Sequence, residues 1–313
     1  MFRRILVATD LSPASEHLLT AVSGLRALGS REAVLVHCLN IRDVGSLANT
    51  LLKLIQPAFE KQRQALVANG FETTAEIRLG LPAIEINRVA AEKECSVIII
   101  GSHGYTLAKE ILLGGVASAV FHSATKPVLL VKMKLRTEGN SVVCEEPLCD
   151  PLGHVLHPTD FSDNAERAFT YLEKIVESGA KRVTLLHVQD RVVGEYLKDR
   201  LDEFNAIDTA RLERLRDRLK AKGTADIRIE VPYGSVAQEI LSRITNKDVS
   251  FVVMGSRGRG FIGELFLGSV SHHIARHSTA AVLLVPPHVS TTKKEDQDME
   301  STGPIKSKIR KET

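Results

Sequence analysis

The chain alternates between short runs of apolar residues and longer amphipathic stretches. The segments RRILVAT at residues 3–9, AVLVHCL at 33–39 and SVIIIGS at 96–102 are almost continuously apolar. Such runs are typical of strands that are buried on both faces of a parallel sheet. Helical periodicity fills the intervals, with a long segment from about Val44 to Val67 and another led by Pro82. The alternation predicts βαβ units and a doubly wound parallel α/β sheet.

The same succession of segments occurs twice. ATDLSPASE at residues 8–16 returns as PTDFSDNAE at 158–166, and GLPAIEI at 80–86 returns as GSVAQEI at 234–240. The offset is 150 residues for the first pair and 154 for the second, so we expect four extra residues in the second copy's long helical region. The repeat is far longer than a solenoid unit. It predicts two homologous domains, each a five-stranded parallel sheet flanked by helices.

Composition shifts suggest where these domains begin and end. We expect the first domain at residues 1–134 and the second at 154–288. Residues 135–153 are polar and contain Pro and Gly, as is typical of a linker. Residues 289–313 have almost no apolar content, which predicts a disordered, charged tail.

The overall composition excludes several classes of partner. Of the 313 residues, 43% are hydrophobic and 25% are charged, as in ordinary globular proteins, and the net charge of +3 gives no case for nucleic-acid binding. No apolar run approaches the ~18 residues that a membrane span requires. Four irregularly spaced cysteines without an export signal favour a reducing, cytoplasmic compartment.

A glycine-rich loop in the second copy is the main candidate for binding chemistry. Gly255, Gly258, Gly268 and Ser269 form the pattern G-x2-G-x9-G-S, directly after an apolar strand and directly before a helical segment. Exposed backbone N–H groups and a helix N-terminus together make an anion site. Arg257 adds positive charge nearby. The alternative is a flexible surface turn, since a glycine pattern alone is weak evidence and this one is neither a Walker A loop nor a dinucleotide fingerprint.

The residues around this loop resemble those of the universal stress protein family. The likeness rests on PTDFS after the first strand of the copy, LLHV ending the second, and MGSRGRGFIGELFLGSVS followed by AAVLLVPP. It covers nearly everything except the linker and the tail. The resemblance implies an adenine nucleotide as ligand, ATP or AMP or ADP, usually with Mg²⁺ or Mn²⁺. It implies that the nucleoside meets Thr159, Asp160 and Val188, and that the phosphates meet Gly255, Arg257, Gly258, Gly268, Ser269 and Ser271.

The first copy keeps only part of this pattern. The matching positions are occupied by Asp10, Gly101, His103, Gly104 and Gly114. Gly115 stands where the second copy has Ser269, and Ala117 stands in place of Ser271, so two candidate phosphate donors are missing. Losing hydrogen bonds to a charged group at ~1.5–3 kcal/mol each predicts weak or absent binding in the first copy.

The resemblance also implies how the two domains associate. Family domains commonly pair through their last strands, and the segments PVLLVK and AVLLVP are apolar enough to need covering. We therefore expect an intramolecular pseudo-dimer, with homodimerisation as a further step.

Three functions remain open at this point. The first is an adenine-nucleotide-binding stress-response protein acting as a sensor or regulatory module. The second is an interaction protein that uses no nucleotide. The third is a slow ATP hydrolase, although the chain shows no G-x-S-x-G elbow and no H-E-x-x-H motif.

The linker region holds residue types that zinc accepts, in the pattern C-x4-C-x4-H-x2-H. They are Cys144, Cys149, His154 and His157. The spacing matches no standard zinc finger, and His157 lies in the strand that leads to Asp160. We therefore expect no metal site here.

Overall fold

A computed structural model describes residues 1–40, 48–102, 113–132, 134–138, 141–145, 149–190, 200–258 and 268–288. The first half contains strands β1 (Arg4–Thr9), β2 (Glu32–Asn40), β3 (Glu72–Gly80), β4 (Val97–Gly101) and β5 (Val128–Val131). Its helices are α1 (Pro13–Ala21), the 3-10 helix η1 (Val22–Leu28), α3 (Ala48–Ala68), α4 (Pro82–Glu92) and α5 (Gly115–Ser123).

The second half repeats this order. Its main strands are β8 (His154–Pro158), β9 (Arg182–Leu186), β11 (Asp226–Glu230), β13 (Phe251–Gly255) and β14 (Ala281–Val285). Its helices are α6 (Asp163–Glu177), α8 (Leu201–Lys220), α9 (Val236–Asn246) and α10 (Ser269–His277). Two short strands, β10 (Gln189–Asp190) and β12 (Tyr233–Gly234), pair in parallel beside them.

The main strands of both halves belong to one sheet, which has ten strands in the described part of the chain. The order is β11-β9-β8-β13-β14-β5-β4-β1-β2-β3, and within each half all neighbours are parallel. In each half, successive strands are added on one side of the first strand and then on its other side. The strand order therefore reverses between β1 and β4 in the first half and between β8 and β13 in the second. The α/β fold predicted from the repeat is confirmed.

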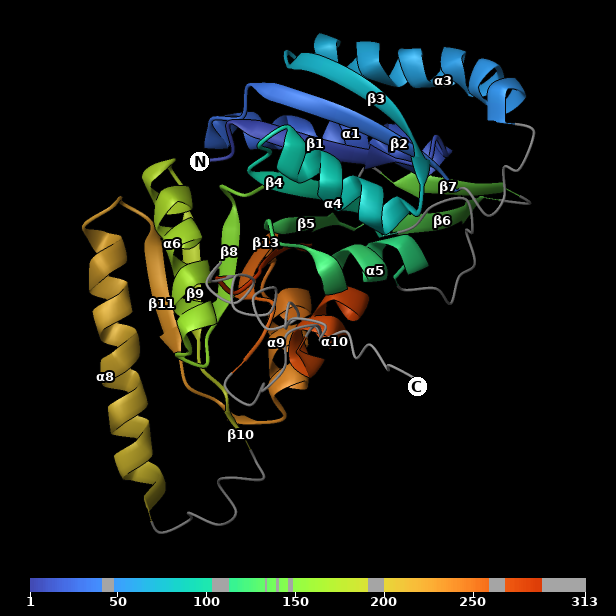
Figure 1. The fold of residues 1–313 in the computed structure, drawn as a ribbon. Coiled ribbons are helices and arrows are strands. Elements are labelled where there is room, and N and C mark those ends of the chain that lie inside the picture. The colour runs from blue at the N-terminus through green and yellow to red at the C-terminus, as the bar shows by residue number, and fades with distance from the viewer. Residues whose placement is uncertain are drawn as a thin grey trace, which may run out of the picture.

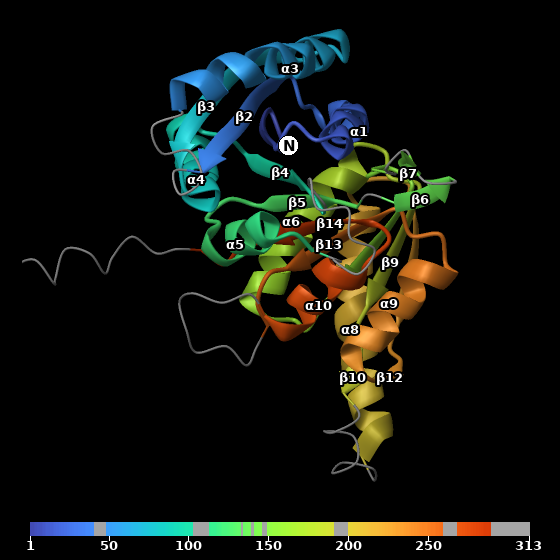
Figure 2. The same ribbon diagram turned by 90° about the vertical axis from the view of Figure 1, so that its right-hand side faces the viewer.

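Helices cover both faces of this sheet (Figures 1 and 2). Buried side chains of α1, α3, α6 and α8 pack on one face, and those of α4, α5, α9 and α10 pack on the other. Because both faces are covered, the central strands are apolar throughout, and every residue of β5, β13 and β14 is buried. The near-continuous apolar runs of the sequence are explained by this burial.

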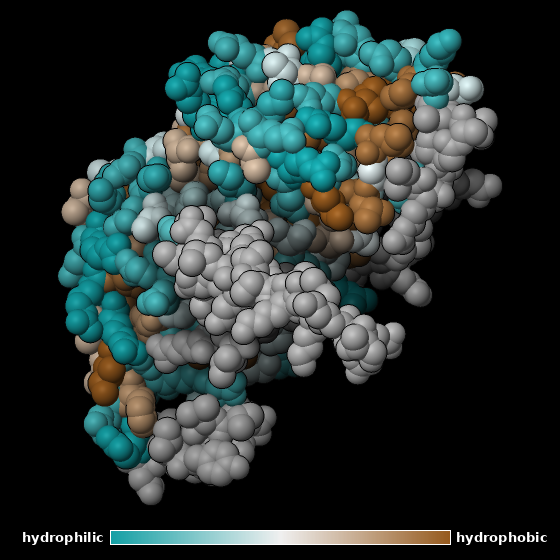
Figure 3. Space-filling model, in the orientation of Figure 1, coloured by the Kyte–Doolittle hydropathy of each residue, from teal (hydrophilic) through white to brown (hydrophobic). Residues whose placement is uncertain are grey.

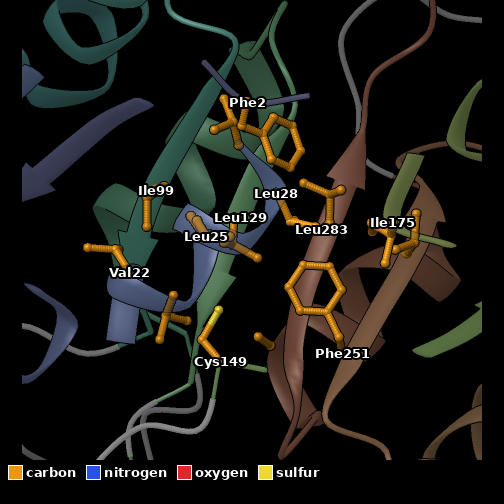
Figure 4. Close-up of a cluster of buried hydrophobic side chains, with 14 of the residues drawn as sticks. Phe2, Val22, Leu25, Leu28, Ile99, Leu129, Cys149, Ile175, Phe251 and Leu283 are labelled. Atoms are coloured by element: carbon orange, nitrogen blue, oxygen red, sulfur yellow. The ribbon is translucent and has the colours of Figure 1, made fainter. Parts of the chain in front are cut away.

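The two halves meet at an antiparallel pair of strands. Leu283 of β14 faces Leu129 of β5 in the register, and both side chains are fully buried. Figure 4 shows these two residues beside Leu28 of the first half and Phe251 of the second. The hydrophobic core on each face of the sheet therefore runs without interruption from one half into the other.

A buried lysine also crosses this boundary. Lys132 directly follows β5, and its Nζ donates hydrogen bonds to the carbonyls of Ala275 and Arg276, at 2.9 and 3.0 Å, near the C-terminal end of α10. A cation at the carbonyl end of a helix is favourable for the helix dipole. Burial nevertheless lowers the pKa of Lys132 to about 8.

The segment expected to be a plain linker contains a hairpin. Strands β6 (Lys134–Glu138) and β7 (Ser141–Glu145) pair antiparallel. After it, Cys149 is buried in the core on the α1 side of the sheet. The backbone there passes so close to η1 that a Cβ on Gly24 would lie 2.5 Å from the Cys149 carbonyl oxygen.

The face shown in Figure 3 is largely hydrophilic where it is coloured, and apolar residues gather on it over the first half, around α3, β3 and α4. Exposed apolar side chains in these elements include Leu54, Leu79 and Ile84, which are 73%, 51% and 52% exposed. None of the helices in the described ranges combines the length and apolar character that crossing a bilayer requires.

Candidate functional site

A cavity of about 300 Å³ opens in the second half where the strand order reverses. It lies at the carboxyl ends of β8 and β13, the position where open parallel sheets bind ligands. All nine residues predicted from the second copy line it: Thr159, Asp160, Val188, Gly255, Arg257, Gly258, Gly268, Ser269 and Ser271. Residues that are 112 positions apart in the chain, from 159 to 271, are thus brought to one site.

The turn after β8 is held by its own side chains. Asp160 Oδ1 accepts hydrogen bonds from the backbone N–H and the hydroxyl of Ser162, at 3.1 and 2.6 Å. Thr159 Oγ1 accepts the N–H of Phe161 at 3.0 Å. These bonds hold Phe161 at a φ of 58°, in the left-handed region that bulky residues rarely adopt. Backbone strain of this kind is often found at functional sites.

The first half builds the same turn after β1. Asp10 Oδ1 accepts the N–H of Ser12 at 3.0 Å and the hydroxyl of Ser15 at 2.5 Å, and Leu11 has a φ of 64°. Thr9 Oγ1 accepts the N–H of Leu11 at 3.0 Å. The strained turn is therefore a shared feature of the two copies and does not distinguish them.

The glycines of the second loop lie where a side chain would collide. A Cβ on Gly258 would be 2.9 Å from Asp160 Oδ2, and a Cβ on Gly255 would be 3.0 Å from the Asn164 amide. Such separations are shorter than ordinary carbon contacts. The loop can approach the Asp160 turn closely only because glycine occupies these positions.

Several bonds close the base of this loop. Ser256 N donates to the carbonyl of Val285 and Gly268 N donates to the carbonyl of Ser256, both at 2.8 Å. The Ser271 hydroxyl, expected to face phosphate, donates to the carbonyl of Gly255 at 2.9 Å. Ser271 is 3% exposed. Its hydroxyl thus ties α10 to the end of β13.

Sequence reasoning missed Asn164, in the first turn of α6. Its Oδ1 accepts the backbone N–H of Arg257 at 2.9 Å, and its Nδ2 donates to the carbonyl of Val285 at 2.9 Å. A difference between the copies could have drawn attention to it, because Ala14 occupies the matching position of the first copy.

His187 also lines the cavity, although it is not among the nine predicted residues. Its Nδ1 lies 2.7 Å from the carbonyl oxygen of Thr159, so the N–H is assigned to this nitrogen. Its Nε2 lies 3.4 Å from Asp208 Oδ2 of α8, and the ring packs 4.6 Å from that of Phe161. These contacts join α8 to the Asp160 turn. Asp208 was missed because nothing in the sequence sets it apart on its helix.

Part of the cavity lining is apolar. These residues are Pro158, Ala165, Leu186, Val188, Val236, Ile240, Met254 and Val270. The polar part of the lining includes Asp160, Arg257 and Ser269, together with the backbone of the glycine loop. A cavity lined by apolar residues together with polar groups and one arginine suits a ligand with a hydrophobic part and an anionic part.

The matching region of the first half is described only in part. Asp10, Gly101 and Gly114 lie at the carboxyl ends of its strands and at the start of α5, as the repeat predicts. His103 and Gly104 lie outside the described residues. His37 occupies the position of His187, with its Nδ1 2.9 Å from the carbonyl of Thr9, and burial lowers its pKa.

The cysteine and histidine residues near the linker do not converge where they are described. His154 bonds the Lys247 carbonyl and the Thr184 hydroxyl, while His157 bonds the Val253 carbonyl and packs on Phe169. The two rings lie on opposite faces of β8, which follows from their spacing of three residues along a strand. The side chain of Cys144 lies outside the described residues, and burial raises the pKa of the Cys149 thiol to about 12.

The fold and the cavity together describe two copies of a doubly wound α/β domain joined in one chain. The universal stress protein family matches the chain twice, over residues 1–132 and 151–286. The chain belongs to this family.

Individual relatives agree with this assignment. A universal stress protein of Methanocaldococcus jannaschii is 31% identical over 157 residues, covering 43% of this chain and 97% of the relative. One of Mycolicibacterium smegmatis is 25% identical over 240 residues, covering 72% of this chain and 75% of the relative. The crystal structure of a universal stress protein from Archaeoglobus fulgidus superposes with a TM-score of 0.72 at 24% identity, covering 91% of this chain and 99% of that one. The last comparison supports the fold of the whole tandem.

Proposed function

We propose that the chain is an adenine-nucleotide-binding stress-response protein that acts as a sensor or regulatory module. The nucleotide is held mainly in the second half. One observation carries this proposal: the nine residues chosen from the second copy line a single cavity at the point where the strand order reverses. The volume of about 300 Å³ is at the lower end of the range for small-molecule sites.

The chemistry of the walls suits each part of the nucleotide. The apolar side around Val188 and Met254 would cover the adenine, and Asp160 and Thr159 would meet the ribose. Backbone amides of the glycine loop and the start of α10 would face the phosphates of ATP, ADP or AMP, with Arg257 adding charge. Every part of the ligand thus has a suitable partner.

A divalent cation would enter with the nucleotide. Asp160 is the one carboxylate among the described residues that line the cavity, and its Oδ1 already accepts two hydrogen bonds from Ser162. Within the described ranges, no cluster of three or more His, Cys, Asp or Glu residues is placed to hold a metal. We therefore expect Mg²⁺ or Mn²⁺ to be bound chiefly through phosphate oxygens.

We also propose that residues 1–134 and 154–288 act as the two domains of an intramolecular pseudo-dimer. The antiparallel pairing of β5 with β14 supports this arrangement. Homodimerisation of the whole chain would be a further step, which its mass in solution would report.

The decisive experiment is chromatography of nucleotide released from the purified protein, followed by titration of ATP with Mg²⁺. Gly258→Val should abolish binding, because even its Cβ would lie 2.9 Å from Asp160 Oδ2. Gly104→Val, at the matching position of the first copy, should change binding little. If both variants bind ATP as the wild type does, the site is wrongly assigned.

Hydrolysis can be followed in the same samples. We expect bound ATP to persist, with turnover no faster than about one per minute, far below ordinary enzymes. Faster release of phosphate would favour an ATP-consuming enzyme over a regulatory module.

A further inference from the structure

The base of the glycine loop is built differently in the two halves. In the second half, the backbone of Ser256 makes two hydrogen bonds. Its N–H donates to the carbonyl of Val285, and its carbonyl accepts the N–H of Gly268. The first half repeats both, with Ser102 N–H donating to Val131 and Gly114 N–H donating to Ser102, each at 3.0 Å. The backbone framework is therefore common to the two copies.

Two side-chain bonds are added to this framework in the second half. Asn164 accepts the Arg257 N–H at 2.9 Å and donates to the same Val285 carbonyl that accepts Ser256. Ser271 donates to the Gly255 carbonyl at 2.9 Å. Asn164 and Ser271 are 8% and 3% exposed, so water competes little for these bonds.

Both positions are alanine in the first half. Ala14 matches Asn164, 150 residues earlier, and Ala117 matches Ser271, 154 residues earlier. Both alanines are buried, at 2% and 5% exposure, and their methyl groups can make no hydrogen bond. The first copy thus keeps the backbone framework and lacks the two side-chain bonds.

We propose that Asn164 and Ser271 are positioning residues, which hold the second glycine loop in the geometry that receives phosphate. The bond from Asn164 fixes the peptide between Ser256 and Arg257, and with it the direction of the next amide, at Gly258. Donors that are already oriented need no reorganisation when an anion arrives. Together with Ser269, these two residues explain why the second half binds nucleotide better. This inference rests on the proposed function.

The test separates the phosphates from the nucleoside by measuring ATP and adenosine binding calorimetrically on the full chain. For Asn164→Ala and for Ser271→Ala we expect the Kd for ATP to rise at least tenfold, while the Kd for adenosine stays within about twofold. Ser271→Thr keeps a hydroxyl and should retain ATP affinity within about threefold of the wild type. Thermal unfolding of each variant verifies that it is folded.

A matched control lies on α9 of the same half. Asn246 donates to the Ser242 hydroxyl at 3.2 Å on the surface and does not line the cavity. Asn246→Ala removes an asparagine side chain without touching the loop, so ATP binding should be unchanged.

A reciprocal experiment keeps the inference testable if Asn164→Ala fails to fold. Ala14→Asn with Ala117→Ser, made in a Gly258→Val chain whose second site is blocked, should strengthen ATP binding to the first half at least fivefold.

Failure of this inference can be told apart from failure of the proposed function. Unchanged ATP affinity in the alanine variants, equal losses for ATP and adenosine, or no gain in the reciprocal chain would each overturn the positioning role. A wild-type chain that binds neither ligand refutes the proposed function itself.

Discussion

The imidazole of His157 is enclosed near the carboxyl end of β8. It is fully buried, with Nδ1 2.8 Å from the Val253 carbonyl and the ring packed edge-on against Phe169 at 5.6 Å. Nε2 has no hydrogen-bond partner within the described part of the chain. Burial penalises the imidazolium, and it lowers the pKa of His157 to about 4 from its usual 6.5.

This pKa makes the protein sensitive to acid. Between pH 6.5 and about 4 the unfolded chain binds a proton that the folded chain does not, so stability is full above pH 6.5 and falls as the pH decreases through this interval. At 1.36 kcal/mol for each pH unit, the interval corresponds to roughly 3 kcal/mol of unfolding free energy.

The matched variant is His157→Val, because Val7 occupies this position in the first half and is also fully buried. Urea unfolding of wild type and variant, from about pH 7.5 to about pH 4.5, gives the free energy of unfolding at each pH. His37 and His154 also have pKa values lowered by burial, but they contribute equally to both proteins. Relative to the variant, the wild type should lose roughly 2.5 kcal/mol across the series, because it ends at about pH 4.5, just above the pKa of about 4 in the folded protein. If the free energies of unfolding of wild type and variant change with pH in parallel, the reasoning is refuted.

Two further predictions concern the junction of the halves. Burial lowers the pKa of Lys132 to about 8 in the folded protein, from 10.5 in the unfolded chain, so the unfolded chain holds the proton more tightly. Between pH 8 and 10.5 the free energy of unfolding of the wild type should therefore rise with pH by roughly 3 kcal/mol relative to Lys132→Met. Denaturant unfolding at several pH values measures this difference. No such rise would mean that the ammonium is not desolvated. Gly24→Ala should destabilise the chain by about 1–3 kcal/mol, because its Cβ would lie 2.5 Å from the Cys149 carbonyl oxygen. The control Gly115→Ala meets no heavy atom within 4 Å and should leave the melting temperature unchanged.

The architecture could be predicted from the sequence because its signals are local and repeated. Apolar runs bounded by helical periodicity identify buried parallel strands, and the offsets of 150 and 154 recur between β1 and β8 and between β4 and β13. The hairpin of β6 and β7 was missed, because the polar and Pro/Gly-containing stretch was interpreted as a linker. Its LRTEGNSVV sequence carries a Gly-Asn pair between short alternating runs, which is a hairpin signal.

Residues of the cavity lining could be chosen from the sequence where they match a pattern. Asp160 and the glycines fall in this group. Asn164 and Asp208 match no pattern. Asn164 bonds the backbone of Arg257, about 90 residues away, and Asp208 contacts His187, about 20 residues away. Only the fold brings these partners together. Ser271 was included for the pattern, but its hydrogen bond to Gly255 depends on how α10 packs against β13.

The pairing of β5 with β14 has a consequence for how the two copies can diverge. Because one polypeptide supplies both strands, the contact forms within a single chain and does not weaken on dilution, as a contact between separate molecules would. The paired strands also lie away from Ala14 and the Asp10 turn, which follow β1. The first copy can therefore change the residues of its cleft and still serve as the permanent neighbour that covers the last strand of the second.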